Sequence, residues 1–207
     1  MCLRRLLAKL GHINEHKSVI AFRYRLSAPI ARFVMKCGIS PTQLNVFGLL
    51  AGLACGVCVA CGLLQVAGVL WLVSALCDAL DGFVARARAI ESVFGEFFDS
   101  VCDRYVDTTV LLGIAWHFMS VNEPFFVLLT FFAVIGVGVT SYSRARAQSL
   151  GLEPGYTGFL NRLERVALLM VAFIFPASLH IVTWALAILS NATAVHRVIA
   201  YSSAARR

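Results

Sequence analysis

Long apolar stretches separated by short charged segments form the main pattern of this sequence. Residues 37–85 and 105–143 contain no Lys or Arg, and residues 166–196 contain no Lys, Arg, Asp or Glu. Each stretch exceeds the ~20 residues that a helix needs to cross a ~30 Å hydrocarbon core. We therefore predict that each stretch holds two membrane crossings or parts of two, which gives six transmembrane helices in all.

Turn-forming residues divide these stretches and give the helices approximate limits. Breaks are expected within Gly62–Gly68, Ser120–Pro124 and Pro176–Leu179. The fold class that follows is an all-α integral membrane protein. The predicted helices cover residues 43–63, 67–91, 94–118, 124–149, 158–176 and 179–199.

The N-terminal segment is basic and lacks the continuous apolar core and the cleavage site of a signal peptide. Between Ser18 and Cys37, the cations Arg25, Arg32 and Lys36 share one face of a helix, and apolar residues occupy another. This pattern predicts either a juxtamembrane helix on the cytoplasmic membrane surface or an ordinary amphipathic helix packed on the protein. We expect three parts, a cytoplasmic segment with this helix (1–42), a six-helix domain (43–199) and a basic tail (200–207).

Composition and charge support a membrane protein and give it an orientation. Hydrophobic residues make up 59% of the chain and charged residues 14%, against roughly 45–50% and about 25% in soluble domains. All 18 Lys and Arg lie in the N-terminal segment, near residues 86–104 and 144–165, or at the C-terminal end. These regions share one side of a six-span path, so the positive-inside rule places them, both termini and the site between them in the cytoplasm. The net charge of +7 thus reports orientation in the cell membrane, among its lipids, and indicates no nucleic-acid partner.

The first predicted span combines a cysteine run with a glycine repeat. Cysteine recurs every third residue from Cys55 to Cys61, as in some metal sites, but no fourth ligand lies nearby. Glycine recurs every fourth residue from Gly48 to Gly56, a spacing that lets helices approach closely. Close helix packing explains this segment better than metal binding does.

Acidic residues gather inside segments that are otherwise apolar enough to cross a membrane. Seven of the eleven lie within residues 78–107. Asp78 and Asp81 are three residues apart, and Asp99 and Asp103 are four apart, so each pair projects from one face of its helix. The short connection between the two helices makes them antiparallel neighbours. The two pairs should then face each other as a cage of four carboxylates.

Such a cage predicts metal-assisted phosphoryl transfer. Four close carboxylates repel one another unless divalent cations neutralise them, and hard oxygen ligands favour Mg²⁺ or Mn²⁺. Two ions per site would nearly balance the charge, could take up a diphosphate and could orient an attacking hydroxyl. Gly82, directly after Asp81, leaves room for a nucleotide beside the helix. The alternative from the residues alone is an ion pathway through a transporter, or an inactive membrane scaffold.

From Asp78 the chain reads DALDGFVARARAIESVFGEFFDSVCD, which fits D-x2-D-G-x2-A-R-x8-G-x3-D-x3-D at every fixed position. This segment resembles the signature of the CDP-alcohol phosphatidyltransferase family, whose members also have six membrane helices. The resemblance implies transfer of a phosphatidyl group from CDP-diacylglycerol to an alcohol, with release of CMP. It implies that two metal ions are held by Asp78, Asp81, Asp99 and Asp103, and that Asp103 also takes the proton of the acceptor hydroxyl.

The same resemblance implies contacts with the CDP donor and a homodimeric assembly. Asn45 departs from the Thr that relatives often carry at its position. The sequence itself does not indicate which surface a dimer would use. The implied donor-binding residues are Pro41, Thr42, Gln43, Leu44, Asn45, Gly82, Arg86 and Ser92.

Four arginines form a second basic cluster. Arg144 and Arg146 end the fourth predicted helix, and Arg162 and Arg165 begin the fifth. Together they could bind a phosphate dianion on the acceptor alcohol through forked hydrogen bonds, or they could serve only as positive-inside anchors.

Short segments narrow the choice of acceptor. SYSRARAQSLGL (141–152) and GFLNRLERV (158–166) resemble bacterial phosphatidylinositol-phosphate synthases, as does DSVCDRYVD (99–107). The resemblance implies inositol phosphate as the acceptor. A phosphatidylglycerophosphate synthase, or a family member with another alcohol, is the alternative.

Overall fold

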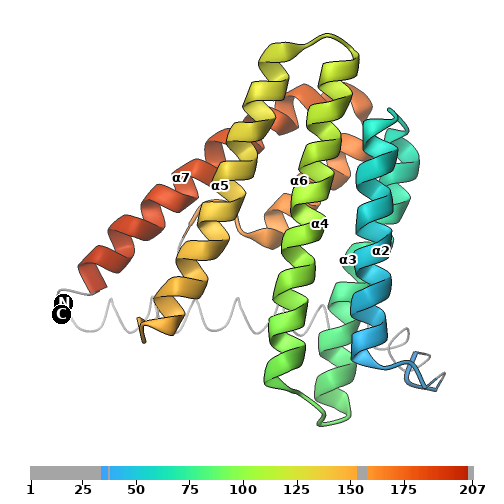
Figure 1. Cartoon of the computed structure of the whole chain (residues 1–207), viewed down its shortest axis with the longest axis vertical. Helices are drawn as coiled ribbons and strands as arrows, with labels where there is room; N and C mark the ends of the chain where they lie inside the picture. Colours follow the sequence, from blue (N-terminus) through green and yellow to red (C-terminus); the bar gives the residue numbers. More distant parts are fainter. Residues whose placement is uncertain (1–33, 37, 153–157, 205–207) are drawn as a thin grey trace, which may run out of the picture.

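The computed structural model describes residues 34–36, 38–152 and 158–204 (Figure 1). The described residues form helices joined by turns and loops and contain no strand, which confirms the all-α prediction. Helix α5 keeps its predicted limits, whereas α6 starts later than expected and α7 continues beyond residue 199. The elements are α2 (Pro41–Ala60), α3 (Leu64–Ala87), α4 (Val93–Ser120), α5 (Pro124–Ser149), α6 (Arg162–Ile174), the 3-10 turn η1 (Pro176–Ser178) and α7 (Leu179–Ala204).

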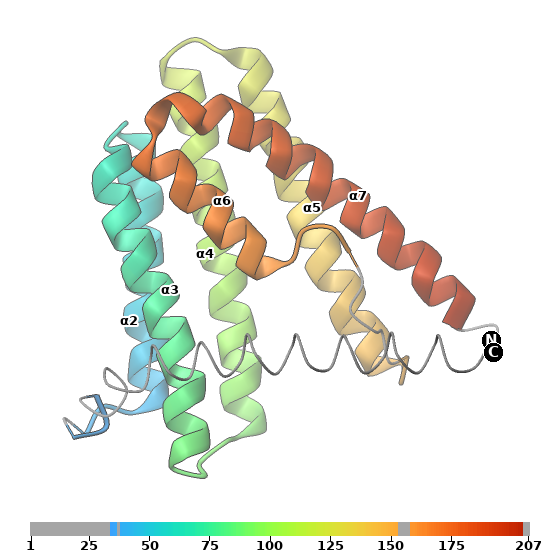
Figure 2. The ribbon, with the colours of Figure 1, turned by 180° about the vertical axis from the view of Figure 1, so that it is seen from behind.

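Helices α2 to α5 run alternately up and down the long axis of the molecule (Figures 1 and 2). Helix α2 packs on α3 and α4, α4 packs on α5, and α5 packs on α7. Helix α6 lies against α3 and α7, and it begins part-way along the long axis rather than at an end (Figure 2). The start of α6 therefore faces the middle of the bundle.

The glycine repeat of α2 is where this helix meets its neighbours. A Cβ atom at Gly48 would lie 3.1 Å from Cβ of Cys77 on α3, and one at Gly52 would lie 2.5 Å from Cγ2 of Val106 on α4. Contacts this close exclude larger side chains unless the neighbours shift. Close helix packing in this segment is thus confirmed, and it brings α2 against both helices that carry the acidic residues.

Three helices that carry candidate site residues begin with capping side chains. The Ser40 hydroxyl accepts a hydrogen bond from the Gln43 N–H at the start of α2. Ser92 caps α4 in the same way, and Asn161 forms a capping box with Glu164 at the start of α6. These caps bind N–H groups that have no partner within the helix, and so they fix where each helix begins.

Four of the described helices are long and apolar enough to cross a membrane: α2, α3, α5 and the segment Pro176–Ser203. Helix α4 has 28 residues, but Asp103, Arg104 and Asp107 interrupt its apolar sequence. Helix α6 has 13 residues, and at 1.5 Å per residue it is shorter than the ~30 Å core. The six-span arrangement therefore stays a prediction.

The expected amphipathic helix (Ser18–Cys37) lies outside the described residues, apart from residues 34–36, which are helical. This short piece is held against the end of α3. The guanidinium of Arg88 donates to the carbonyl oxygens of Met35 at 3.0 Å and Ile39 at 3.1 Å. The contact joins the chain ahead of α2 to the loop that connects α3 and α4.

Candidate active site

Three of the four predicted carboxylates converge between α3 and α4. One ligand oxygen from each of Asp78, Asp99 and Asp103 lies within 4.8 Å of the other two. Oδ1 of Asp99 is buried and has no hydrogen-bond partner among the described residues. Because hard carboxylate oxygens at this separation suit Mg²⁺ or Mn²⁺, these residues fit a divalent cation.

Asp81 lies beside this cluster and faces α2. Its Oδ2 accepts a hydrogen bond of 2.6 Å from Nδ2 of Asn45, and its Oδ1 accepts from the N–H of Gly82. Asp81 and Asn45 are both buried. The helical spacing that placed Asp81 near Asp78 could not show this contact, because the partner comes from another helix.

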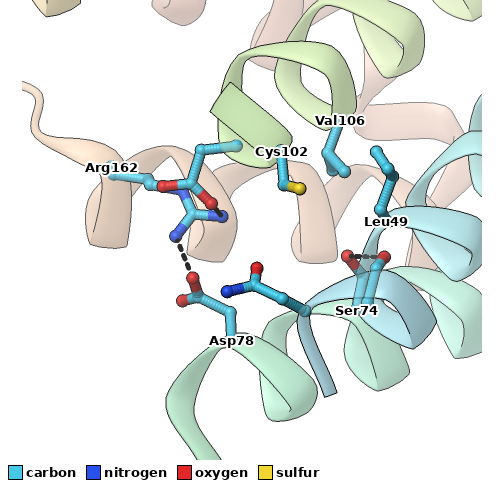
Figure 3. Close-up of a pocket in the computed structure, with 9 residues that line it drawn as sticks. Leu49, Ser74, Asp78, Cys102, Val106 and Arg162 are labelled. Atoms are coloured by element: carbon cyan, nitrogen blue, oxygen red, sulfur yellow. Dashed lines mark hydrogen bonds and ion pairs between the residues drawn. The ribbon is translucent and has the colours of Figure 1, made fainter. Parts of the chain in front are cut away.

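Arg162, the first residue of α6, lies between two of the clustered carboxylates. Its Nη1 is 2.7 Å from Oδ1 of Asp78, and its Nη2 is 2.5 Å from Oδ1 of Asp103. Figure 3 shows the guanidinium reaching from α6 toward Asp78. The structure thus places this residue, predicted as a ligand of the acceptor phosphate, in the carboxylate cluster.

Two contacts hold α6 in place behind Arg162. Arg165, one turn further on, forms a 2.8 Å ion pair with Asp107, and both side chains are buried. The indole N–H of Trp71 on α3 donates to the carbonyl oxygen of Val166 at 3.0 Å. The structure therefore pairs Arg165 with Asp107 on α4. The sequence had predicted only a contact between Arg165 and an acceptor phosphate.

Thr193 on α7 holds the segment that leads into α6. Its Oγ1 accepts hydrogen bonds from the N–H groups of Phe159 at 3.0 Å and Leu160 at 2.9 Å, and it donates to the carbonyl oxygen of Leu189. Gly158 has a φ of +119°, and a side chain there would meet the methyl group of Thr193. Together these contacts explain why α6 begins at residue 162 and not at the predicted residue 158.

A cleft of about 790 Å³ lies between the starts of α2 and α4 and the end of α3. Asp81 and Asp99 line it, so the cleft reaches the carboxylates. Six of the eight predicted donor-binding residues also line it: Pro41, Thr42, Asn45, Gly82, Arg86 and Ser92.

The other two predicted donor-binding residues do not line this cleft. The side chain of Gln43 turns back and accepts a hydrogen bond from the Ser40 N–H at 2.8 Å. Leu44 is buried in a small apolar cluster with Val34 and Leu80. Taking residues 41–45 as one contact segment overlooked the helical geometry, which turns successive side chains in different directions.

The structure does not bring the four predicted acceptor arginines together as one group. Arg162 and Arg165 pair with carboxylates, whereas Arg144 and Arg146 are exposed at the end of α5. A further arginine, Arg197 on α7, also lies near the start of α6, and the sequence pattern had suggested for it only a place among the basic residues at the C-terminal end. Arg197 directly follows residues 166–196, which contain no Lys, Arg, Asp or Glu. This position at the end of an uncharged stretch was the signal in the sequence that could have identified it.

Arg197 is 5% exposed and lies between α5 and the start of α6. Its Nη1 donates to the carbonyl oxygen of Thr140 at 2.6 Å, and its Nη2 donates to Oδ1 of Asn161 at 3.0 Å. This buried cation therefore joins α7 to α5 and to the residue that precedes Arg162.

Comparison with known proteins gives a consistent result. The family model described as CDP-alcohol phosphatidyltransferase matches residues 39–196. The chain is 32% identical over 199 residues to the phosphatidylinositol phosphate synthase of Mycolicibacterium smegmatis, covering 89% of this chain and 87% of that protein. It is 36% identical over 169 residues to the archaetidylinositol phosphate synthase of Pyrococcus horikoshii, covering 82% and 87%.

Solved structures agree with these sequence matches. The crystal structure of Mycobacterium tuberculosis phosphatidylinositol phosphate synthase with CDP-DAG bound superposes with a TM-score of 0.76 at 30% identity, covering 86% of this chain and 94% of that one. The same protein in complex with manganese and citrate also gives a TM-score of 0.76 at 30% identity, covering 84% and 88%.

Proposed function

Because the chain belongs to the CDP-alcohol phosphatidyltransferase family of enzymes, we propose that it transfers a phosphatidyl group from CDP-diacylglycerol to inositol phosphate and releases CMP. The relatives named as phosphatidylinositol phosphate synthases support this acceptor. The relative crystallised with CDP-DAG supports the donor.

The observation that carries the proposal is the position of Asp99. This residue belongs both to the carboxylate cluster and to the wall of the 790 Å³ cleft. A nucleotide bound in the cleft would place its diphosphate beside the cluster. The glycine at position 82 and the guanidinium of Arg86 line the same cleft, and they suit close approach of a phosphate and pairing with it.

In the proposed reaction, a hydroxyl oxygen of the acceptor attacks the β-phosphorus of the donor. The bond from that phosphorus to the bridging oxygen breaks, and CMP leaves with this oxygen. The carboxylate of Asp103 receives the hydroxyl proton, a role that requires hydrogen-bonding reach of the acceptor. Holding the two substrates in line supplies much of the acceleration.

Divalent metal is part of this proposal, with two Mg²⁺ or Mn²⁺ ions per site. Such ions would neutralise diphosphate charge and stabilise the leaving phosphate. The residues that would hold them are Asp78, Asp99 and Asp103 in the cluster, and Asp81 beside it. The manganese complex of the tuberculosis relative supports a divalent ion.

For the acceptor phosphate we retain the predicted arginines and add Arg197. Arg197 contacts α5 and the residue before α6, and so it lies between the two helices that carry the four predicted arginines. Arg146 lies on the exposed end of α5, and Arg162 lies at the carboxylate cluster. A phosphorylated acceptor held by these arginines would lie near the start of α6, where Arg162 meets the carboxylates.

The proposal also sets the enzyme in the membrane. Six helices would cross the bilayer, with both termini and the site facing the cytoplasm, because the Lys and Arg residues lie on that side of the path. The segment between Ser18 and Cys37 would lie on the cytoplasmic surface, and two copies of the chain would form a homodimer.

An acceptor panel tests the proposed reaction. Purified enzyme receives CDP-diacylglycerol, Mg²⁺ and, in separate reactions, inositol 3-phosphate, glycerol 3-phosphate or free inositol, and CMP release is measured. We expect release with inositol 3-phosphate and none after EDTA treatment. Release with glycerol 3-phosphate alone would identify a phosphatidylglycerophosphate synthase, and no release with any acceptor would contradict the enzyme assignment of the site.

A further inference from the structure

Arg162 lies between two of the three carboxylates that would hold a cation in the cluster. Its two terminal nitrogens are 2.7 Å and 2.5 Å from Oδ1 of Asp78 and Oδ1 of Asp103. A Mg²⁺ ion coordinated by the same two oxygens would lie about 2.1 Å from each. The guanidinium and an ion between these two oxygens would therefore compete for the same space.

The space around Arg162 supports this conclusion. With the guanidinium in place, the cavity lined by Asn45, Asp78, Asp103 and Arg162 has a volume of only about 10 Å³. This is close to the ~10–15 Å³ that a single water molecule requires. On this side of the cluster, between Asp78 and Asp103, a metal ion with its own water ligands would fit only if the arginine moved.

Charge leads to the same result. The four carboxylates Asp78, Asp81, Asp99 and Asp103 carry a formal charge of −4, and one guanidinium offsets only part of it. A cation at this position stabilises the cluster without metal, yet it repels a divalent ion that approaches the same oxygens.

We propose that Arg162 is an internal counter-ion of the carboxylate cluster, which binds Asp78 and Asp103 when metal is absent and is displaced from them when metal binds. The inference rests on the proposed function, since it takes the cluster to be the metal site. It assigns Arg162 a role in metal loading, in addition to its predicted contact with the acceptor phosphate.

The contacts of α6 fix the backbone at Arg162 more firmly than its side chain. The backbone around Arg162 is held by the Asn161 cap and by the buried pair of Arg165 with Asp107. The side chain of Arg162 itself is 27% exposed, and its Nε has no hydrogen-bond partner among the described residues. The guanidinium therefore has two principal contacts to exchange, both with carboxylates that the metal would use.

Arg104 provides a matched control. Its Nη2 is 4.0 Å from Oδ2 of Asp103, and its side chain is 41% exposed. Removing either arginine removes one positive charge near the cluster. Of these two arginines, only Arg162 lies between two carboxylates. Comparing the two variants therefore distinguishes displacement of Arg162 by the metal from a general effect of removing one positive charge.

The test measures Mn²⁺ binding to purified enzyme in detergent by electron paramagnetic resonance, without either substrate. We expect Arg162→Gln to bind Mn²⁺ at least about tenfold more tightly than the wild type, and Arg104→Gln to bind it less than about threefold more tightly. Equal effects of the two substitutions, or unchanged or weaker binding in Arg162→Gln, would overturn the displacement model. Absence of Mn²⁺ binding in the wild type would instead contradict the metal site of the proposed function.

Thermal unfolding gives a second readout that does not depend on activity. In EDTA, Arg162→Gln should unfold at a lower temperature than the wild type, because its carboxylates then lack a counter-ion, and Mn²⁺ should stabilise this variant more than the wild type. Arg162→Lys keeps the charge but cannot bind both carboxylates through one planar group, so we expect intermediate Mn²⁺ affinity. If Mn²⁺ raised the unfolding temperature equally in the wild type, Arg162→Gln and Arg162→Lys, this result would contradict the inference.

Discussion

The side chain of Asp103 has two structural contacts and one proposed chemical role. It belongs to the carboxylate cluster, it binds Arg162 at 2.5 Å, and it is the proposed acceptor of the hydroxyl proton. Because the amide of asparagine has nearly the shape of the carboxylate, Asp103→Asn removes charge and basicity with little change in volume. The variant separates the chemistry of this position from its packing.

We expect Asp103→Asn to lower turnover by at least about a hundredfold at every pH, the range in which general bases contribute. The measurement is CMP release from CDP-diacylglycerol and inositol 3-phosphate, with thermal unfolding as the control for folding. Turnover near the wild-type value would remove Asp103 from its assigned role.

Asn45 acts on the site through Asp81. Its amide donates at 2.6 Å to a buried carboxylate that lies beside the metal cluster. We expect Asn45→Ala to reduce kcat/KM for CMP release by about tenfold or more, as is typical for residues that orient metal ligands. Asn45→Thr keeps a hydroxyl donor and is the matched control, so equal activity of the two variants would show that this hydrogen bond is unimportant.

Helical spacing could predict which acidic residues share a face, but not their partners. Asp78, Asp99 and Asp103 do come together, although α3 and α4 make few direct contacts and both pack on α2 instead. The contacts of Asp81 and Arg162 depend on α2 and α6, whose positions come from packing over long sequence distances. The spacing of residues along one helix does not show which residues of distant helices will lie beside them.

At the scale of helices, the ion pair of Arg165 with Asp107 joins α6 to α4 within the bundle. Both side chains are buried, and removal of one partner leaves the other charged group unpaired, at a cost of about 3–5 kcal/mol. Arg165→Met should therefore lower the unfolding temperature in detergent. The double variant Arg165→Met with Asp107→Leu should recover much of that loss, and an additive loss would show that the two residues are not coupled.

Close contact between α2 and α4 makes a second prediction at this scale. A Cβ atom at Gly113 of α4 would collide with the backbone carbonyl of Gly56 on α2, whereas one at Gly138 of α5 would meet nothing within 4 Å. Gly113→Ala should destabilise the protein by about 1–3 kcal/mol, because backbone atoms cannot rotate away. Gly138→Ala, at an exposed helical position, should be neutral or slightly stabilising.

Helix limits were predictable where local signals determine them. Pro124 begins α5 at the predicted residue, and the turns after α2 and α4 fall where Gly and Asn–Glu–Pro interrupt the apolar pattern. The start of α6 was predicted too early because the N–H groups of Phe159 and Leu160 donate hydrogen bonds to Thr193 on α7. Charge patterns indicated that this region was cytoplasmic but not that it enters the bundle.

For the whole molecule, the predicted orientation places the turn between α2 and α3 outside the cell. Cys61 at this turn is exposed, whereas Cys55 in the same helix is buried. In intact cells, a membrane-impermeant maleimide should label the wild type and not Cys61→Ser. Labelling that appears only after the cytoplasmic side is opened would reverse the proposed orientation.

Helix α7 holds in place the residues that lead into α6. Thr193 on α7 binds the backbone leading into α6, and α6 presents Arg162 to the carboxylates. During synthesis, α2 to α4 can enter the membrane with their acidic residues before α7 exists, because chains emerge from the N-terminus. The four aspartates are therefore made before the support for Arg162: a nascent chain carries the whole carboxylate set but cannot hold its arginine in place until α7 has been made.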